Sequence, residues 1–162
     1  ELKITLSYGS GDRTVDSLAA YVQEAWKTIG VKVELNVVDG GAFLELINNK
    51  SFDVVLAAQG FFTDGSQGYV FRCDSIATGF NITSYCNQNY DALDEQQIRE
   101  FDSATRDAMQ AQLSQKVWTD LPVLPIRFGE ARTGYSSTIH NFFPNGYGFL
   151  WSLSYVWVEQ ST

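Results

Sequence analysis

Few residues of this chain carry side chains that could do covalent or metal chemistry. There is one histidine, His140, and there are two cysteines, Cys73 and Cys86. No serine stands in a nucleophile-elbow pattern, and His140 lies in an aromatic stretch, which favours a structural role for it. Nineteen acidic residues could supply carboxylate pairs for glycoside hydrolysis, but no motif singles out two of them. The chain is therefore predicted not to be an enzyme.

The two cysteines could instead bind a metal, form a disulfide or remain free. Their spacing does not match a zinc ribbon and His140 is distant in sequence, so no metal site is predicted. The residues between Cys73 and Cys86 read as a loop, and a disulfide closing it would stabilise the fold by about 3 kcal/mol. Such a bond would indicate an oxidising compartment. Two buried free thiols are the alternative.

Gly9-Ser10-Gly11 stands between a predicted strand and a predicted helix, where a phosphate-binding loop could lie. It lacks the further glycines of a dinucleotide fingerprint and the lysine of a P-loop. A turn is therefore predicted at this place, and no cofactor is expected.

The elements that must position these residues begin with a strand, a helix and a second strand. Residues 2–6 alternate apolar and polar, as do residues 31–38. Between them, apolar residues recur every three or four positions from Val15 to Ile29, with Asp12 as a plausible N-cap and Gly30 as the C-cap. A strand–helix–strand unit of this length predicts a parallel sheet.

The rest of the chain predicts further helices and strands. A short helix is expected over 42–49, followed by a strand over 52–57 that is buried on both faces. Two longer helices are expected over 88–101, capped by Asn87 with Asp94, Glu95 and Glu100 on its exposed face, and over 104–120, capped by Ser103. Pro122 ends the second helix, and strands are expected over 123–128 and 132–136. The fold class is α/β.

Composition limits the class of protein. The chain has 162 residues, of which 44% are apolar, and carries a net charge of −8. One compact domain over residues 1–162 is expected at this length. Apolar runs are too short to span a membrane, and the acidic balance disfavours nucleic acid as a partner.

Ligand binding is better supported than catalysis. Ligands of open parallel sheets lie beyond the carboxyl ends of the strands, which here lead into residues 7–12, 39–41 and 59–67. All three loops are rich in glycine or small polar residues, and the third adds Phe61 and Phe62 beside Asp64. Aromatic walls with a few fixed polar groups are typical of a small-ligand pocket.

The order of these segments resembles the family 5 extracellular solute-binding proteins of ABC importers, which include dipeptide- and oligopeptide-binding proteins. The matching segments are residues 2–8, 25–35, 42–43, 52–56, 85–93 and 121–126. The resemblance implies a class II periplasmic-binding-protein-like lobe with a mostly parallel sheet flanked by helices. It also implies the C-terminal lobe of a two-lobed protein, which is periplasmic or extracellular. Its partners would be the missing N-terminal lobe and an ABC permease.

The resemblance also implies a ligand site and a Cys73–Cys86 disulfide. Peptides, sugars, nickel complexes and opines are ligands in this family. Two departures matter: Gln59 and Phe62 stand where peptide binders carry a tryptophan and the amine-binding aspartate, and Asp39-Gly40-Gly41 lacks an aromatic residue. The nearest substitute for the amine-binding aspartate is Asp64. The predicted ligand-binding residues are Tyr8, Ser10, Asp39, Gln59, Phe61, Phe62 and Asp64.

Two other functions remain open from the sequence. One is a small secreted α/β hydrolase that uses His140 or a carboxylate pair. The other is a protein-interaction module that binds through the aromatic tail from Tyr135 to Trp157, which contains no Lys or Arg.

Overall fold

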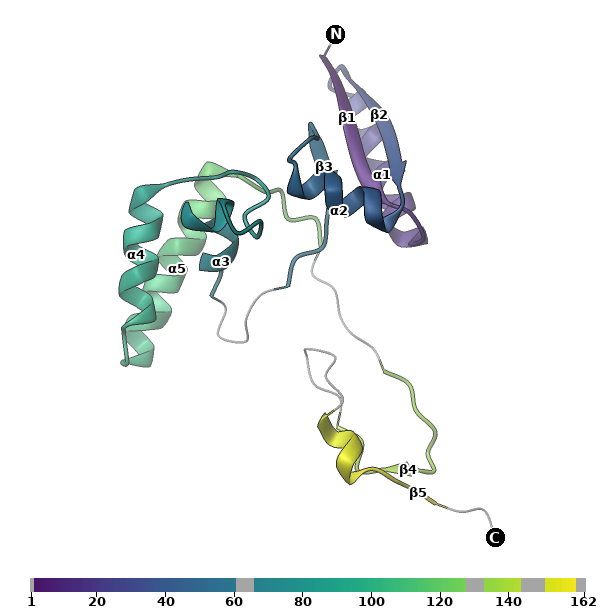
Figure 1. The fold of residues 1–162 in the computed structure, drawn as a ribbon, viewed down its shortest axis with the longest axis vertical. Helices are drawn as coiled ribbons and strands as arrows, with labels where there is room; N and C mark the ends of the chain where they lie inside the picture. Colours follow the sequence, from purple (N-terminus) through teal and green to yellow (C-terminus); the bar gives the residue numbers. More distant parts are fainter. Residues whose placement is uncertain (1, 61–65, 128–132, 144–150, 160–162) are drawn as a thin grey trace. The chain divides into compact units, whose positions relative to one another are not determined.

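The computed structural model describes residues 2–60, 66–127, 133–143 and 151–159 (Figure 1). Contacts divide the chain into two compact units, Glu1–Val123 and Leu124–Thr162. Among the described residues, no helix is both long and apolar enough to cross a membrane.

A parallel three-stranded sheet opens the first unit. Its strands are β1 (Leu2–Gly9), β2 (Val31–Val38) and β3 (Val54–Leu56), in the order β2-β1-β3. The β1–β2 register runs from Leu2 beside Val31 to Gly9 beside Val38, so the predicted strand–helix–strand unit is confirmed. The first strand is longer than predicted, because the turn begins only at Ser10.

Helix α1 (Arg13–Lys27) connects β1 and β2 and covers the apolar face of the sheet. The Asp12 side chain accepts a hydrogen bond from the Thr14 N–H, which confirms the predicted N-cap. Gly30 has a φ of 82°, a conformation that glycine adopts at little cost where the chain leaves the helix. The core between helix and sheet contains Leu6, Tyr8, Ala19 and Val33.

The opposite face of the sheet is polar. The register places Thr5 beside Glu34 and Ser7 beside Asn36, and the Asn36 amide donates to the Ser7 hydroxyl over 3.1 Å. The prediction that the third strand is buried on both faces was wrong, because Val54, Val55 and Leu56 are all only half-buried. Among the described strands β3 pairs with β1 alone and lies at the edge of the sheet.

Helix α2 (Gly40–Asn48) begins directly after β2. The Asp39 carboxylate accepts a hydrogen bond from the Ala42 N–H and caps it, so Gly40 and Gly41 belong to the helix and not to a loop.

A second hydrophobic core lies among the helices that follow. These are α3 (Gly68–Phe71), the 3₁₀ turn η1 (Asp74–Ile76), α4 (Gln88–Ile98) and α5 (Ser103–Asp120), with α4 packed on α5 (Figure 1). Its buried members are Val70, Phe71, Tyr90, Leu113 and Val117. The rings of Phe71, Tyr85 and Tyr90 meet edge to face, with centroids 6.1–6.2 Å apart.

The helix caps were predicted with mixed success. Asn87 caps α4 through hydrogen bonds from the Asn89 and Tyr90 N–H groups, as predicted. Helix α5 is capped by Asp102, one residue before the predicted Ser103, because the Asp102 carboxylate accepts from the Thr105 N–H. Leu121 ends α5 in the left-handed conformation, directly before Pro122.

Three further predictions were wrong. Asp94 does not lie on an exposed face of its helix, since it is only 1% exposed. Residues 123–127 and 133–136 form no strand, whereas residues 128 and 132 lie outside the described part of the chain. A strand needs a neighbouring strand to satisfy its N–H and C=O groups, and none of the described strands pairs with these segments.

The second unit contains a small antiparallel ladder that the sequence did not predict. It joins β4 (Ile139–His140) to β5 (Trp157–Val158), and a 3₁₀ turn, η2 (Trp151–Tyr155), precedes β5. The His140 ring stacks on Trp157 with centroids 4.1 Å apart, and its Nε2 atom lies 3.4 Å from a Glu159 carboxylate oxygen.

Candidate functional site

The carboxyl ends of the three parallel strands lie at one edge of the sheet, which we call the carboxyl edge. It is followed in the chain by Ser10 after β1, Asp39 after β2 and Gln59 after β3, and all three residues are exposed. The Ser10 N–H donates to the Val38 carbonyl over 2.8 Å, which holds the ends of β1 and β2 together. The carboxyl edge therefore presents exposed polar side chains, and the backbone hydrogen bond fixes the ends of β1 and β2 relative to each other.

The predicted ligand residues are distributed unevenly over this edge. Tyr8 is 4% exposed and packs in the core beneath the sheet, so its ring supports the edge from within. Asp39 uses one carboxylate oxygen to cap α2. Phe61, Phe62 and Asp64 lie outside the described residues. A ligand role for all seven residues stays a prediction.

Tyr69 on α3 contacts the segment that follows β3. Its hydroxyl donates to the Gly60 carbonyl and lies 3.4 Å from the Gln59 side-chain nitrogen. The sequence does not single out Tyr69 as a residue of the site. No local pattern links it to Gln59, ten residues earlier.

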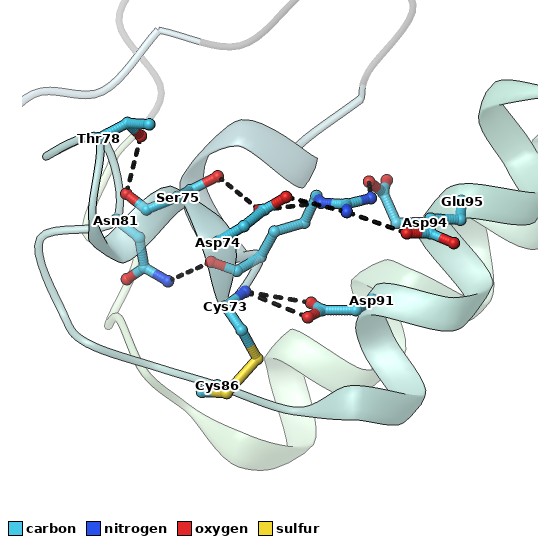
Figure 2. Close-up of polar contacts among 10 residues, drawn as sticks. Cys73, Asp74, Ser75, Thr78, Asn81, Cys86, Asp91, Asp94 and Glu95 are labelled. Atoms are coloured by element: carbon cyan, nitrogen blue, oxygen red, sulfur yellow. Dashed lines mark hydrogen bonds and ion pairs between the residues drawn. A yellow bond between two sulfur atoms is a disulfide. The ribbon is translucent and has the colours of Figure 1, made fainter.

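The structure contains the predicted Cys73–Cys86 disulfide, with Cα atoms 4.5 Å apart (Figure 2). The Cys73 N–H donates to the Asp91 carboxylate over 3.2 Å, which ties the disulfide to α4. We call residues 73–86 the disulfide loop.

Asn81 organises the interior of the disulfide loop. Its side-chain amide donates to the carbonyls of Arg72 and Tyr85 over 3.0 and 2.8 Å, and its oxygen accepts from the Thr83 hydroxyl. Asn81 is 0% exposed. The asparagine of the Asn81-Ile82-Thr83 triplet, which has the form of a glycosylation acceptor, therefore lies in the folded interior.

A cluster of charges lies beside the disulfide loop, and Figure 2 shows its carboxylates gathered around one guanidinium. Arg72 lies 3.0 Å from Asp74, 3.2 Å from Glu95 and 3.5 Å from the buried Asp94. Hydrogen bonding from Arg72 lowers the pKa of the Asp74 carboxyl. Asp94 also accepts from the Gln97 amide over 3.1 Å.

An open hollow of about 440 Å³ borders this cluster, lined in part by Tyr69, Arg72, Ser75 and Thr78. Arg72 directly follows α3, and the three carboxylates around its guanidinium come from η1 and α4. The cluster therefore holds α3, η1 and α4 together. Over the described part of the chain, no group of three or more His, Cys, Asp or Glu side chains could hold a metal ion.

Comparison with known proteins tests the predicted family. Residues 1–79 match the family described as bacterial extracellular solute-binding proteins, family 5, middle. The chain is 27% identical over 124 residues to the oligopeptide-binding protein AppA of Bacillus subtilis, and 23% identical over 128 residues to di/tripeptide-binding protein 1 of Pseudomonas aeruginosa. The chain is therefore similar in sequence to family 5 solute-binding proteins, most directly over residues 1–79. The resemblance predicted from the sequence is thus confirmed.

Solved structures give the same result for the fold. The structure superimposes on Bacillus subtilis AppA in complex with a nonapeptide with a TM-score of 0.78 at 19% identity, covering 98% of this chain and 32% of that one. The dipeptide-binding protein of Pseudoalteromonas sp. SM9913 in complex with Met-Leu gives a TM-score of 0.69 at 19% identity, covering 75% of this chain and 25% of that one. The predicted α/β, periplasmic-binding-protein-like fold is confirmed.

The match covers only part of the relatives. The two curated relatives align over 75% and 77% of this chain but only 23% and 24% of their own length. This chain therefore spans about a quarter of each of them.

Proposed function

We propose that this chain contributes one wall of the ligand site in an extracellular solute-binding protein of an ABC importer, and that its ligand is a peptide. The observation that carries the proposal is the carboxyl edge, where Ser10, Asp39 and Gln59 follow three parallel strands and are all exposed. Ligands of open parallel sheets bind at such an edge. The similarity to proteins named for peptide binding supports peptide as the ligand class.

Each predicted residue has a distinct part in this proposal. Ser10, Asp39 and Gln59 supply hydrogen bonds to the peptide backbone, and Tyr8 supports the edge from the core. Phe61 and Phe62 pack against side chains of the peptide, and Asp64 pairs with its free amine. The chain binds and releases the peptide unchanged, without a cofactor.

The remaining parts of the proposal concern the larger assembly. Residues 1–162 act as a single lobe that faces a second lobe of the same protein, and the peptide is held between the two. Closure of the two lobes is a hinge motion that the ligand favours because it binds the closed form better. The closed protein then delivers the peptide to a permease, in the periplasm or outside the cell.

Binding of defined peptides tests the proposal. The probes are Met-Leu and a nonapeptide, titrated calorimetrically into the full-length gene product that carries this segment. We expect binding, and we expect Asp64→Asn to weaken it about 10- to 150-fold, since a charge-assisted hydrogen bond to the peptide amine is worth about 1.5–3 kcal/mol. Asp107→Asn, on the exposed face of α5, is the matched control and should bind as the wild type does.

Two results of this titration would contradict the proposal. If neither peptide binds, or if Asp64→Asn and Asp107→Asn bind alike, the assigned site is wrong. Mass spectrometry of the peptide after incubation separates binding from catalysis. Intact peptide is expected, whereas cleavage that disappears in His140→Ala would favour the hydrolase.

A further inference from the structure

Tyr69 contacts two segments that are separate in the chain, the segment after β3 and the disulfide loop. The first contact is polar: the Tyr69 hydroxyl donates to the Gly60 carbonyl and lies within hydrogen-bonding distance of the Gln59 side chain. Gln59 and Gly60 stand at the start of the loop that carries the third part of the proposed peptide site. The role inferred for Tyr69 therefore rests on that proposed function.

The second contact of Tyr69 is aromatic. Its ring meets Phe80 edge to face, with centroids 5.9 Å apart and planes inclined by 74°. Such pairs are attractive beyond the area they bury, because the positive edge of one ring faces the negative face of the other. Phe80 belongs to the disulfide loop, whose ends are joined by Cys73 and Cys86.

The backbone of Tyr69 is fixed by its neighbours. Val70 and Phe71 are buried in the second core, and Gly68 lies against the buried Asp94 carboxylate. The Tyr69 side chain therefore extends from a segment whose neighbours are buried, and it contacts both loops from there.

We propose that Tyr69 is a positioning residue for the peptide site, and that the Cys73–Cys86 disulfide acts on that site through the Phe80–Tyr69–Gly60 contacts. The disulfide sets the place of Phe80, Phe80 limits the Tyr69 ring, and the Tyr69 hydroxyl holds Gly60. Cys86 is exposed, so the bond is accessible to a thiol reductant. Peptide affinity therefore depends on the redox state of a bond that does not touch the peptide.

The test follows the Gly60 amide by ¹⁵N NMR in the full-length gene product that carries this segment, with and without Met-Leu. Tyr69→Phe keeps the ring contact with Phe80 and removes the hydroxyl. We expect its Gly60 order parameter to fall and its Kd for Met-Leu to rise about 5-fold, the effect of losing one hydrogen bond. Tyr85→Phe is the matched control, because it also loses a hydroxyl bond in this region, to Asp120, and should leave Gly60 unchanged.

A double-mutant cycle tests the path from the disulfide. Replacing both cysteines by serine should lower the Gly60 order parameter in the wild-type background and add little in Tyr69→Phe. If the cysteine variant loses its fold, Phe80→Leu takes its place, since it breaks the ring contact and keeps the disulfide. Circular dichroism shows whether the double cysteine-to-serine variant has kept its fold.

Two results would overturn the inference: a Gly60 signal unchanged by Tyr69→Phe, or equal effects of the second change in both backgrounds. The NMR measurements need no peptide. A full-length wild-type protein that shows the Gly60 coupling but binds no Met-Leu therefore contradicts the proposed function and not the coupling. If Tyr69→Phe and Tyr85→Phe bind Met-Leu with the same Kd, the positioning role of Tyr69 is contradicted.

Discussion

The carboxylate of Asp94 occupies the space in which a side chain at Gly68 would stand. A Cβ atom added at Gly68 would lie 2.7 Å from the Asp94 Cγ atom, closer than real contacts allow. Asp94 cannot move aside easily, because it is buried and held by Arg72 and Gln97. The glycine that begins α3 and the acid in the middle of α4 therefore form one packing unit.

Gly68→Ala should lower the free energy of unfolding by about 1–3 kcal/mol, the usual effect of forcing extra atoms into a packed site. The measurement is urea denaturation followed by circular dichroism. Gly40→Ala is the matched control, because an added Cβ at the start of α2 meets no atom within 4 Å. Equal stability of the two variants would contradict the packing described here.

Asp94→Ala should lower the free energy of unfolding by about 2–3 kcal/mol. This value lies below the range for a fully buried ion pair, because Arg72 is 19% exposed and keeps Asp74 and Glu95 as partners. The companion Glu95→Ala removes an exposed partner of the same arginine and should change stability by less than about 1 kcal/mol. If Glu95→Ala lowers the free energy of unfolding more than Asp94→Ala does, the exposed Arg72–Glu95 contact stabilises the cluster more than the buried one.

Tyr90→Phe is expected to leave the stability unchanged or raise it slightly. Its hydroxyl is buried and has no hydrogen-bond partner in the described structure, and burial raises its pKa. Removing an unsatisfied polar group relieves its desolvation cost while the ring contacts remain. Thermal unfolding measures the effect, and a clear fall in Tm would mean that the hydroxyl has a partner, such as an ordered water.

Acid should destabilise the second core through Asp120. Asp120 accepts from the Tyr85 hydroxyl over 2.7 Å and from the Asn87 amide over 3.0 Å, and these bonds lower its pKa. A carboxyl whose pKa is lower in the folded state contributes stability that is complete above its unfolded pKa of about 3.9. That contribution is lost as the pH falls through the lower folded value.

The urea midpoint should therefore be lower at about pH 2.5 than at about pH 5. Tyr85→Phe should show a smaller difference between the two pH values, because it removes the first cause of the lowered Asp120 pKa. Tyr155→Phe, in the second unit, serves as the control and should behave as the wild type. A pH dependence equal in all three proteins would exclude Asp120 as its source.

The sequence predicted those parts of the fold that depend on local pattern. Alternation predicted β1 and β2, and side-chain chemistry predicted the caps Asp12 and Asn87, because each of these signals lies within a few residues. The position of Asp94 could not be predicted in this way. Its partners Arg72 and Gly68 lie more than twenty residues earlier, and the buried side of α4 includes the polar Gln97.

The same distinction applies to the candidate site. Parallel strands made it predictable that Ser10, Asp39 and Gln59 would follow the carboxyl edge. Tyr69 was not predictable, because its role depends on contacts with Gln59 and with Phe80 that no local pattern in the sequence indicates. The expected strand was wrong over residues 123–127, because no described strand lies beside them to satisfy their backbone N–H and C=O groups.

The number of cysteines has a consequence for how this chain acquires its covalent structure. Within these 162 residues there are two cysteines, so only one intramolecular pairing exists. Oxidation within the chain therefore involves no choice between partners and no slow reshuffling by an isomerase. Within these 162 residues, an oxidant alone should suffice to join Cys73 to Cys86.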